Sequence, residues 1–272
     1  MRSTPEQWHY SRKAKPMAIV IAVCNEKGGV GKTTTARNLA GGLSQRGYTV
    51  LAVDLDGQCN LTNAYNVPIS ADNNILTALE GKGSVAEAVV HTPEGDLITG
   101  TPLMKTAEAR FLKLMAREKL LTKALKPLQK EYNFIILDTP PQFSIVLLNA
   151  LCCSNLVVIP TLAEKSCLEG TASVIETVDT VNETFDTGVK IAGILMTMHN
   201  ERSILKREMQ DLAESLAKEK GTKVFNAYIR QNTAIGEAYA LGESIYTYEK
   251  KSNGCSDYTA FVEELLQDIG KE

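Results

Sequence analysis

Short continuous apolar runs recur along the chain, and helical stretches separate them. Runs of this length are typical of strands that are buried on both faces of a parallel sheet. The predicted strands are Ala18–Cys24, Thr49–Asp54, Phe134–Asp138, Leu156–Ile159, Ile191–Met198 and Val224–Ile229. The predicted helices are Thr33–Gln45, Thr106–Tyr132 (broken near Pro127), Ser144–Cys152, Leu168–Phe185, Ser203–Lys220 and Gly236–Leu241.

The alternation of strands and helices predicts the fold class. Strands joined through helices form right-handed crossovers, and these place the strands side by side in one sheet. We therefore expect an α/β fold, a doubly wound, mostly parallel sheet with helices on both faces. No internal repeat or low-complexity segment interrupts the order. Since 272 residues suit one large domain, residues 17–272 are predicted to form a single domain.

Residues 1–16 have a different pattern from the rest of the chain. Four basic residues stand against Glu6 alone, two prolines are present, and apolar residues show no period. This composition predicts a basic flexible arm, which is either a solvated tail or a contact for DNA or a partner.

Composition excludes several classes of function. The 29 Lys and Arg residues stand against 32 Asp and Glu residues, so the net charge is −3 and any contact with nucleic acid needs a local patch. No stretch approaches the roughly 20 apolar residues of a membrane span, and no apolar secretory block stands near Met1. We expect a cytoplasmic protein without stable membrane insertion. The six cysteines form no CxxC motif and are interpreted as reduced thiols, without the spacing of a metal site.

The segment from Lys27 to Thr34 reads KGGVGKTT and lies between the first predicted strand and the first predicted helix. It does not match the ordinary GxxxxGK[ST] phosphate loop, because Glu26 occupies the first glycine position. It matches the deviant form KGGxGK[ST], which adds a lysine at the start. Average residue usage gives such a match by chance in about one chain in 10⁴ or fewer. The segment therefore predicts a phosphate-binding loop.

Each residue type in this loop suits a triphosphate with Mg²⁺. The glycines let backbone N–H groups turn toward phosphate oxygens, and the following helix points its positive end at the same anion. Lys32 can bridge the β- and γ-phosphates, Thr33 supplies a hard oxygen for Mg²⁺, and Thr34 reaches the α-phosphate. The predicted loop ligands of ATP or ADP are Lys27, Gly28, Gly29, Val30, Gly31, Lys32, Thr33 and Thr34.

The deviant loop resembles that of the ParA/MinD group of P-loop ATPases. The resemblance implies that the extra lysine, Lys27, crosses a nucleotide-bridged homodimer to the partner's phosphates. An arginine finger supplied in this way accelerates hydrolysis by ~10³–10⁵ in other enzymes. Lys27 is therefore a predicted catalytic residue. Lys32 of the same loop and Asp56 of the segment described next are the other two.

Two acidic strand ends follow the loop in the order that this group shows. The segment from Asp54 to Thr62 resembles the DxDPQ switch, with Gly57 in place of the usual proline, which predicts a looser loop. The resemblance implies that Asp56 orients the attacking water and that Asp54 supports the magnesium shell. Asp138, which precedes Thr-Pro-Pro, matches a Walker B carboxylate that holds Mg²⁺ through water. The predicted metal residues are Thr33, Asp54 and Asp138.

The likeness to ParA-type partition proteins extends over about residues 18–270. It implies adenine contacts from Arg230 and Asn232, where the family reads IPRN and this chain has Arg230 for the proline. It also implies binding of non-specific DNA through Arg202, with Lys206 and Arg207 on the same helix, although a second family arginine falls at Ala234. The alternatives are an ordinary solvated helix face, or a DNA patch in the arm or at Lys250 and Lys251.

The resemblance thus implies a slow, partner-stimulated ATPase that dimerises with ATP, binds DNA and acts with a ParB-type centromere-binding protein on the nucleoid. A related positioning ATPase for another cargo is the alternative. A MinD-like membrane protein is disfavoured, because acidic residues flank the C-terminal apolar stripe from Tyr258 to Ile269. A nitrogenase iron-protein type shares the deviant loop but needs cluster-binding cysteines, a role that Cys152 or Cys153 does not fit.

Overall fold

A computed structural model describes residues 17–199 and 204–271, with side chains from 208 onward in the second range. Its centre is a seven-stranded sheet in the order β3-β4-β2-β5-β1-β6-β7. Only β3 runs antiparallel to its neighbour, β4. The strands are β1 (Ile19–Val23), β2 (Val50–Asp54), β3 (Val89–Val90), β4 (Asp96–Ile98), β5 (Phe134–Asp138), β6 (Leu156–Thr161) and β7 (Lys190–Met196).

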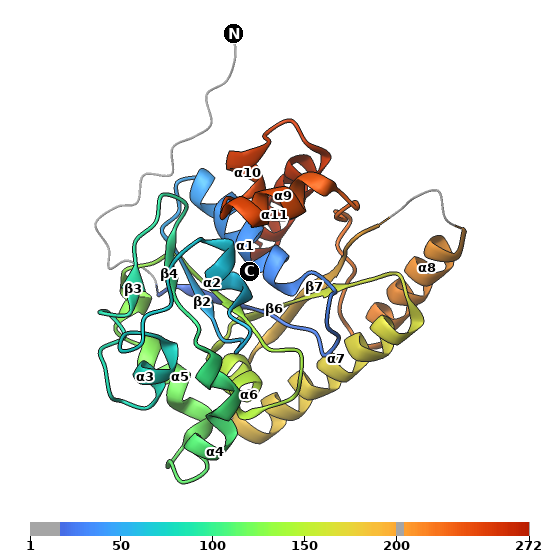
Figure 1. Ribbon diagram of the computed structural model, residues 1–272. Helices are drawn as coiled ribbons and strands as arrows, with labels where there is room; N and C mark the ends of the chain where they lie inside the picture. Colours follow the sequence, from blue (N-terminus) through green and yellow to red (C-terminus); the bar gives the residue numbers. More distant parts are fainter. Residues whose placement is uncertain (1–16, 200–203, 272) are drawn as a thin grey trace.

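Helices cover both faces of the sheet (Figure 1). One group packs on the first face: α1 (Lys32–Gln45), α2 (Asn60–Ala64), α9 (Thr233–Leu241), α10 (Ile245–Tyr248) and α11 (Asn253–Ile269). The other group packs on the second face: α3 (Ile75–Leu79), α4 (Ala107–Phe111), α5 (Leu120–Leu125), α6 (Ile145–Cys153), α7 (Lys165–Phe185) and α8 (Ile204–Glu219). Short 3₁₀ turns complete the second group: η1 (Pro102–Thr106), η2 (Arg117–Lys119) and η3 (Leu128–Lys130). The predicted doubly wound α/β architecture is confirmed.

Alternation along the central strand explains the two cores. In β1, Val20 and Ala22 belong to the core under α3–α8, while Ile21 and Val23 belong to the core under α1 and α9–α11. Successive side chains of a strand point to opposite faces, so a strand buried on both faces is apolar throughout. This is why an unbroken apolar run predicted β1 correctly.

The predicted strand Val224–Ile229 is wrong as a regular strand, although the segment runs beside β7. The N–H groups of Phe225 and Ile229 donate to the carbonyls of Ile194 and Met196 at 2.9 and 2.8 Å, and isolated bridges join Val224 to Ile194 and the following Arg230 to His199. The backbone N–H groups of Asn226 and Ala227 donate instead to the carboxylate of Glu264 in α11, at 3.1 and 3.0 Å. A side chain therefore takes the donors that a strand ladder would use.

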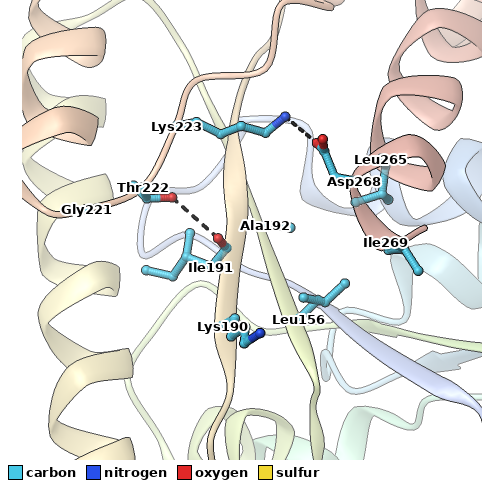
Figure 2. A pocket seen from close by; sticks show the side chains of 10 residues that line it. All are labelled: Leu156, Lys190, Ile191, Ala192, Gly221, Thr222, Lys223, Leu265, Asp268 and Ile269. Carbon is cyan, nitrogen blue, oxygen red and sulfur yellow. Dashed lines mark hydrogen bonds and ion pairs between the residues drawn. The ribbon is translucent and has the colours of Figure 1, made fainter. Parts of the chain in front are cut away.

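The same region encloses a cavity of about 380 Å³ at the start of β6 and β7 (Figure 2). Its apolar wall includes Leu156 and Leu265, and Lys223 pairs with Asp268 across it. Because parallel strands start at the edge opposite to their carboxyl ends, this cavity lies away from the loop that follows β1. The cavity lies between α11 and the edge of the sheet, and none of the predicted site residues lines it.

The predicted long helix Thr106–Tyr132 is divided into η1, α4, η2, α5 and η3. The first part ends at Phe111, and Ala116, with a φ of 50° in the left-handed region, turns the chain into η2. Sequence analysis also missed α2, α3, α10, β3 and β4, which are short, and it recognised α11 only as the apolar stripe from Tyr258 to Ile269. In residues 17–199 and 204–271, no helix is long and apolar enough to cross a bilayer.

Candidate active site

The phosphate loop joins the end of β1 to the start of α1. Gly29 and Gly31 have φ angles of +75° and +85°, which L side chains rarely adopt, so glycine is needed at both positions. Gly31 is also the N-cap of α1. A Cβ added at Gly28 or Gly29 would meet no atom within 4 Å, so open space lies beside the loop backbone. An anion there would lie at the positive end of α1.

Residues at the ends of β6 and β7 hold this loop in place, and sequence analysis did not predict these contacts. The hydroxyl of Thr197 lies 2.9 Å from the carbonyl oxygen of Val30 and 3.1 Å from that of Thr161. Asn25 donates to the carbonyl of Pro160 at 2.8 Å and accepts from the N–H of Lys27 at 3.0 Å. Val30 has a fully buried side chain, so only its backbone can face a ligand.

The two loop lysines have opposite environments. Lys32 is 7% exposed, and its Nζ donates to the carbonyl of Lys27 at 2.7 Å. Burial lowers the pKa of Lys32, and the carboxylates of Asp138 and Asp56 oppose this shift. Lys27 has an exposed side chain that passes over Gly170 of α7. A Cβ at Gly170 would lie 3.0 Å from Cγ of Lys27, so glycine leaves the path of this side chain open.

Thr33 and Asp138 form the part of the site that suits Mg²⁺. Oγ1 of Thr33 donates to Oδ2 of Asp138 at 2.8 Å. Oδ1 of Asp138 is buried without a hydrogen-bond partner among the described residues. Burial raises the pKa of Asp138, and the nearby Asp54 adds to the rise. A hydroxyl beside an unsatisfied carboxylate oxygen is the donor chemistry that Mg²⁺ and its waters require.

Asp54 is fully buried and shapes the loop that follows β2. Its Oδ2 accepts from the N–H and the hydroxyl of Thr62 at 2.8 and 2.7 Å, and its Oδ1 accepts from the N–H of Asp56 at 3.1 Å. Burial raises the pKa of Asp54 to about 6. Because both oxygens are already bonded, the predicted support of Mg²⁺ by Asp54 is indirect and stays a prediction.

Asp56 faces the phosphate loop across a cavity of about 520 Å³. Its Oδ1 accepts from the N–H of Gln58 at 2.9 Å, which fixes the carboxylate at the cavity wall. The other side of the cavity is formed by α9, through Ile235, Gly236 and Tyr239. The structure thus brings Asp56 and the loop residues Gly28, Gly29, Gly31, Lys32, Thr33 and Thr34 to one cavity.

Gly57, where related switch loops have proline, packs closely against η1. A Cβ at this position would lie 2.7 Å from Cγ and 3.1 Å from the backbone nitrogen of Lys105. A larger residue would require Lys105 of η1 to move, so glycine at this position allows the close packing of the two segments. Sequence analysis predicted the freedom of this position but not the close approach.

The predicted adenine contacts do not line the cavity. The guanidinium of Arg230 binds Asp257, with Nε 3.1 Å from Oδ1 and 3.0 Å from Oδ2. Oδ1 of Asn232 caps α9 by accepting from the N–H of Ala234 at 2.9 Å. Both side chains position α9 and α11 here, and their contact with adenine stays a prediction.

The predicted DNA residues lie outside what the structure describes: Arg202 falls between the described ranges, and Lys206 and Arg207 belong to α8 without described side chains. The six cysteines are free of disulfides. Burial raises the pKa of Cys24 and of Cys153 to about 12. No group of three His, Cys, Asp or Glu residues in the described ranges could hold a metal ion by itself.

Comparison with known proteins agrees with this geometry. A family model described as an AAA domain, AAA_31, matches residues 18–191. The chromosome-partitioning ATPase Soj of Thermus thermophilus is 35% identical over 250 residues, which cover 92% of this chain and 96% of Soj. The chromosome partitioning protein ParA of Myxococcus xanthus is 34% identical over 254 residues, covering 91% of this chain and 88% of that protein.

A solved structure with the same fold contains a nucleotide. Cobyrinic acid a,c-diamide synthase from Mycobacterium smegmatis, with a bound ATP analog and magnesium, has a TM-score of 0.82 and 28% sequence identity to this chain. The superposition covers 93% of this chain and 95% of the other.

Proposed function

The chain belongs to the ParA/Soj family of P-loop ATPases, and from this premise we propose that it is a partition ATPase that binds ATP with Mg²⁺, dimerises around it and hydrolyses it slowly. The observation that carries the proposal is the hydrogen bond from Thr33 to Asp138, whose second oxygen has no partner in the part of the chain that the structure describes. Oxygens so arranged beside a phosphate loop suit Mg²⁺ with a triphosphate better than a phosphate alone.

Different residues of the chain bind the phosphates, hold Mg²⁺ and orient the attacking water. Backbone N–H groups of the loop and Nζ of Lys32 bind the β- and γ-phosphates, and Thr33 and Asp138 hold Mg²⁺, which neutralises phosphate charge when bound. Asp56, held at the cavity wall, orients the water for in-line attack on the γ-phosphorus. Positioning and charge compensation supply most of the rate in such reactions.

The exposure of Lys27 supports action across a dimer. Lys32 is buried and satisfies the carbonyl of Lys27, whereas the side chain of Lys27 is exposed above Gly170. A second copy that faces the loop would receive this cation at its own triphosphate. ATP therefore favours the homodimer, and hydrolysis releases it.

We propose that the ATP-bound dimer binds non-specific DNA on the nucleoid and that a ParB-type DNA-binding protein stimulates its turnover. The names of the relatives, which give chromosome partitioning, support an action on DNA. Positioning of another cargo is the second candidate. Membrane positioning through α11 is disfavoured, because Tyr258, Phe261 and Val262 of its apolar stripe are buried in the core.

The test is sedimentation of the full chain with DNA in the presence of Mg-ATP, Mg-ADP or no nucleotide, at 50 and 200 mM salt. Partition function predicts sedimentation with Mg-ATP alone, and affinity that falls steeply with salt. Hydrolysis without any retention on DNA would favour a positioning ATPase for another cargo, and absence of nucleotide binding would overturn both.

A further inference from the structure

Positive charge is concentrated in one part of the chain. Residues 105–130 contain eight basic residues and only two acidic ones, Glu108 and Glu118, in a protein with a net charge of −3. The basic residues are Lys105, Arg110, Lys113, Arg117, Lys119, Lys123, Lys126 and Lys130. The rest of the chain is therefore acidic, and this segment is a local positive region.

Four of these lysines form a row along one helical face: Lys119, Lys123, Lys126 and Lys130, here called the lysine row. Their spacing of four, three and four residues places them on the same side of the consecutive turns η2, α5 and η3. At a rise of about 1.5 Å per residue the row is roughly 16 Å long. The opposite face, with Leu121, Leu125 and Leu128, is buried.

The lysine row forms no ion pair among the described residues, and all four side chains are exposed. Glu118 and Glu131 flank its two ends, but no acid lies between Lys119 and Lys130. Two other acids of this region have partners of their own: Glu80 binds Arg110 at 2.8 Å, and Glu108 accepts from the N–H of Ile145. Unpaired cations in line repel one another, so an arrangement of this kind gains most from an external polyanion.

The row is also held rigidly against the core. Asn149 of α6 accepts from the N–H of Leu121 at 3.0 Å and donates to the carbonyl of Arg117 at 2.7 Å. These two bonds fix the junction of η2 and α5. A preformed row loses less conformational entropy on binding than four independent lysines would.

We propose that the lysine row is a contact for the phosphate backbone of double-stranded DNA, separate from the residues of α8. The inference rests on the proposed function, and it adds a second surface to it. B-DNA carries one charge per about 1.7 Å of axis, so a 16 Å row spans enough phosphates to satisfy every lysine. Between the lysines, Thr122 and Gln129 are half-buried and Pro127 is exposed, so the four ammonium groups are the feature of this face that suits a phosphate backbone.

An anionic membrane is the competing partner. The loop before the row exposes Leu112, Leu114 and Met115, the last by 89%. Apolar side chains beside basic ones also occur at membrane surfaces. The experiment therefore includes vesicles as well as DNA.

The test compares two full-length variants that lose the same charge. One replaces the lysine row (Lys119→Gln, Lys123→Gln, Lys126→Gln, Lys130→Gln), and the matched control replaces four other exposed lysines (Lys82→Gln, Lys165→Gln, Lys218→Gln, Lys271→Gln). Fluorescence anisotropy with a labelled duplex and Mg-ATP, from 50 to 200 mM salt, gives the affinity and its salt slope. Basal ATP hydrolysis and Tm, which should stay unchanged, show that each variant is folded.

The inference predicts that the row variant loses at least tenfold in affinity at 50 mM salt and that its log–log salt slope decreases by about 3 to 4, since each neutralised phosphate contributes about 0.9. The control should keep the wild-type slope. Equal slopes in the row variant and wild type would overturn the inference and leave the proposed function standing.

Two further outcomes are separable. A wild-type protein that hydrolyses ATP without binding the duplex would overturn the DNA part of the proposed function and this inference with it. Binding of the wild type, but not the row variant, to vesicles of phosphatidylserine and phosphatidylcholine, with duplex binding unchanged in both, would assign the row to a membrane instead.

Discussion

Thr33 donates its hydroxyl proton to Oδ2 of Asp138 over 2.8 Å, and Oδ1 of the same carboxylate is buried without a partner among the described residues. An ionised carboxylate in this position costs folding free energy until a cation compensates it. The arrangement therefore favours the binding of Mg²⁺ and lowers the stability of the protein without the metal. This relationship connects stability, metal binding and catalysis in one side chain.

The first prediction is that Asp138→Asn stabilises the empty protein and weakens Mg-ATP binding. Burial, and then the charge of Asp54, raise the pKa of Asp138, so the folded state holds its proton more tightly than the unfolded state does. Stability from this group is thus present below its unfolded pKa and is lost as pH rises through the folded pKa. We expect a gain of about 1 to 3 kcal/mol at pH 7.

Calorimetric unfolding at pH 7 and pH 4 measures this gain, with exposed Asp179→Asn as the control. The gain should be small at pH 4, where Asp138 is protonated in wild type as well. A variant less stable than wild type at pH 7, with unchanged Mg-ATP affinity, would contradict the account of this site.

The second prediction separates the two loop lysines. Lys32→Ala should lose nucleotide affinity, because its buried ammonium group lies between the phosphate loop and the carboxylates. Lys27→Ala should bind Mg-ATP normally, since its side chain is exposed in one copy, yet lose hydrolysis by ~10³-fold or more, as expected for a cation supplied by a second copy. Isothermal calorimetry and phosphate release measure the two properties. Wild-type turnover by Lys27→Ala would remove the proposed role of this lysine.

The third prediction concerns Gly170, which lies in the second turn of α7, where this helix faces the phosphate loop. A methyl group there would lie 3.0 Å from Cγ of Lys27 and 3.1 Å from Oδ1 of Asn25, so Gly170→Ala should displace Lys27. Hydrolysis by the dimer should fall by at least tenfold while the affinity of one copy for Mg-ADP stays the same. Gly270→Ala, at the end of α11 and away from the site, is the matched control, because a Cβ there meets no atom closer than 3.4 Å. Equal rates in both variants would mean that Lys27 reaches its target by another path.

The fourth prediction concerns Glu94, whose carboxylate joins the loop before β4 to helices α1 and α10. The carboxylate binds Arg37 of α1, and it accepts hydrogen bonds from Ser244, the N-cap of α10, and from Thr247 within α10. Although burial raises the pKa of Glu94, Arg37 and these hydrogen bonds outweigh that effect and lower it. Its contribution to stability is therefore present above the unfolded pKa of about 4.5 and disappears as pH falls through the lower folded pKa.

Glu94→Gln should lose about 2 to 4 kcal/mol of unfolding free energy at pH 7, because Arg37 is left buried without its counter-charge. Urea unfolding at pH 7 and below pH 4 measures the difference, which should shrink in acid. Exposed Glu87→Gln is the control and should match wild type at both pH values. A constant difference across this range would show that the carboxylate acts by shape and not by charge.

The features that neighbouring residues determine were predicted from the sequence. The apolar run of β1 and the glycines and lysines of the phosphate loop were all predicted from neighbouring residues. Asp138 was predicted because it ends such a run, is followed by Thr-Pro-Pro, and comes after the phosphate loop and the Asp54 segment in the chain. These residues act through backbone conformation and strand position, which adjacent residues set.

Features that depend on distant residues were missed. Thr197 holds the loop at Val30 from 167 positions away, and Gly170 makes room for Lys27 from another helix. The segment from Val224 to Ile229 has the composition of a strand, but Glu264 takes its backbone donors. Each of these contacts exists only after the sheet and its helices have packed, so neighbouring residues carry no sign of it.

The central claim is that Mg-ATP closes two copies of this chain around their nucleotides. Sedimentation velocity of Asp56→Ala, in which loss of the water-orienting carboxylate slows hydrolysis, tests it most directly. With Mg-ATP the account predicts a species of twice the 29.6 kDa of one chain, and with Mg-ADP a single chain. A single chain in both nucleotides, at protein concentrations where calorimetry shows that Mg-ATP is bound, would contradict it.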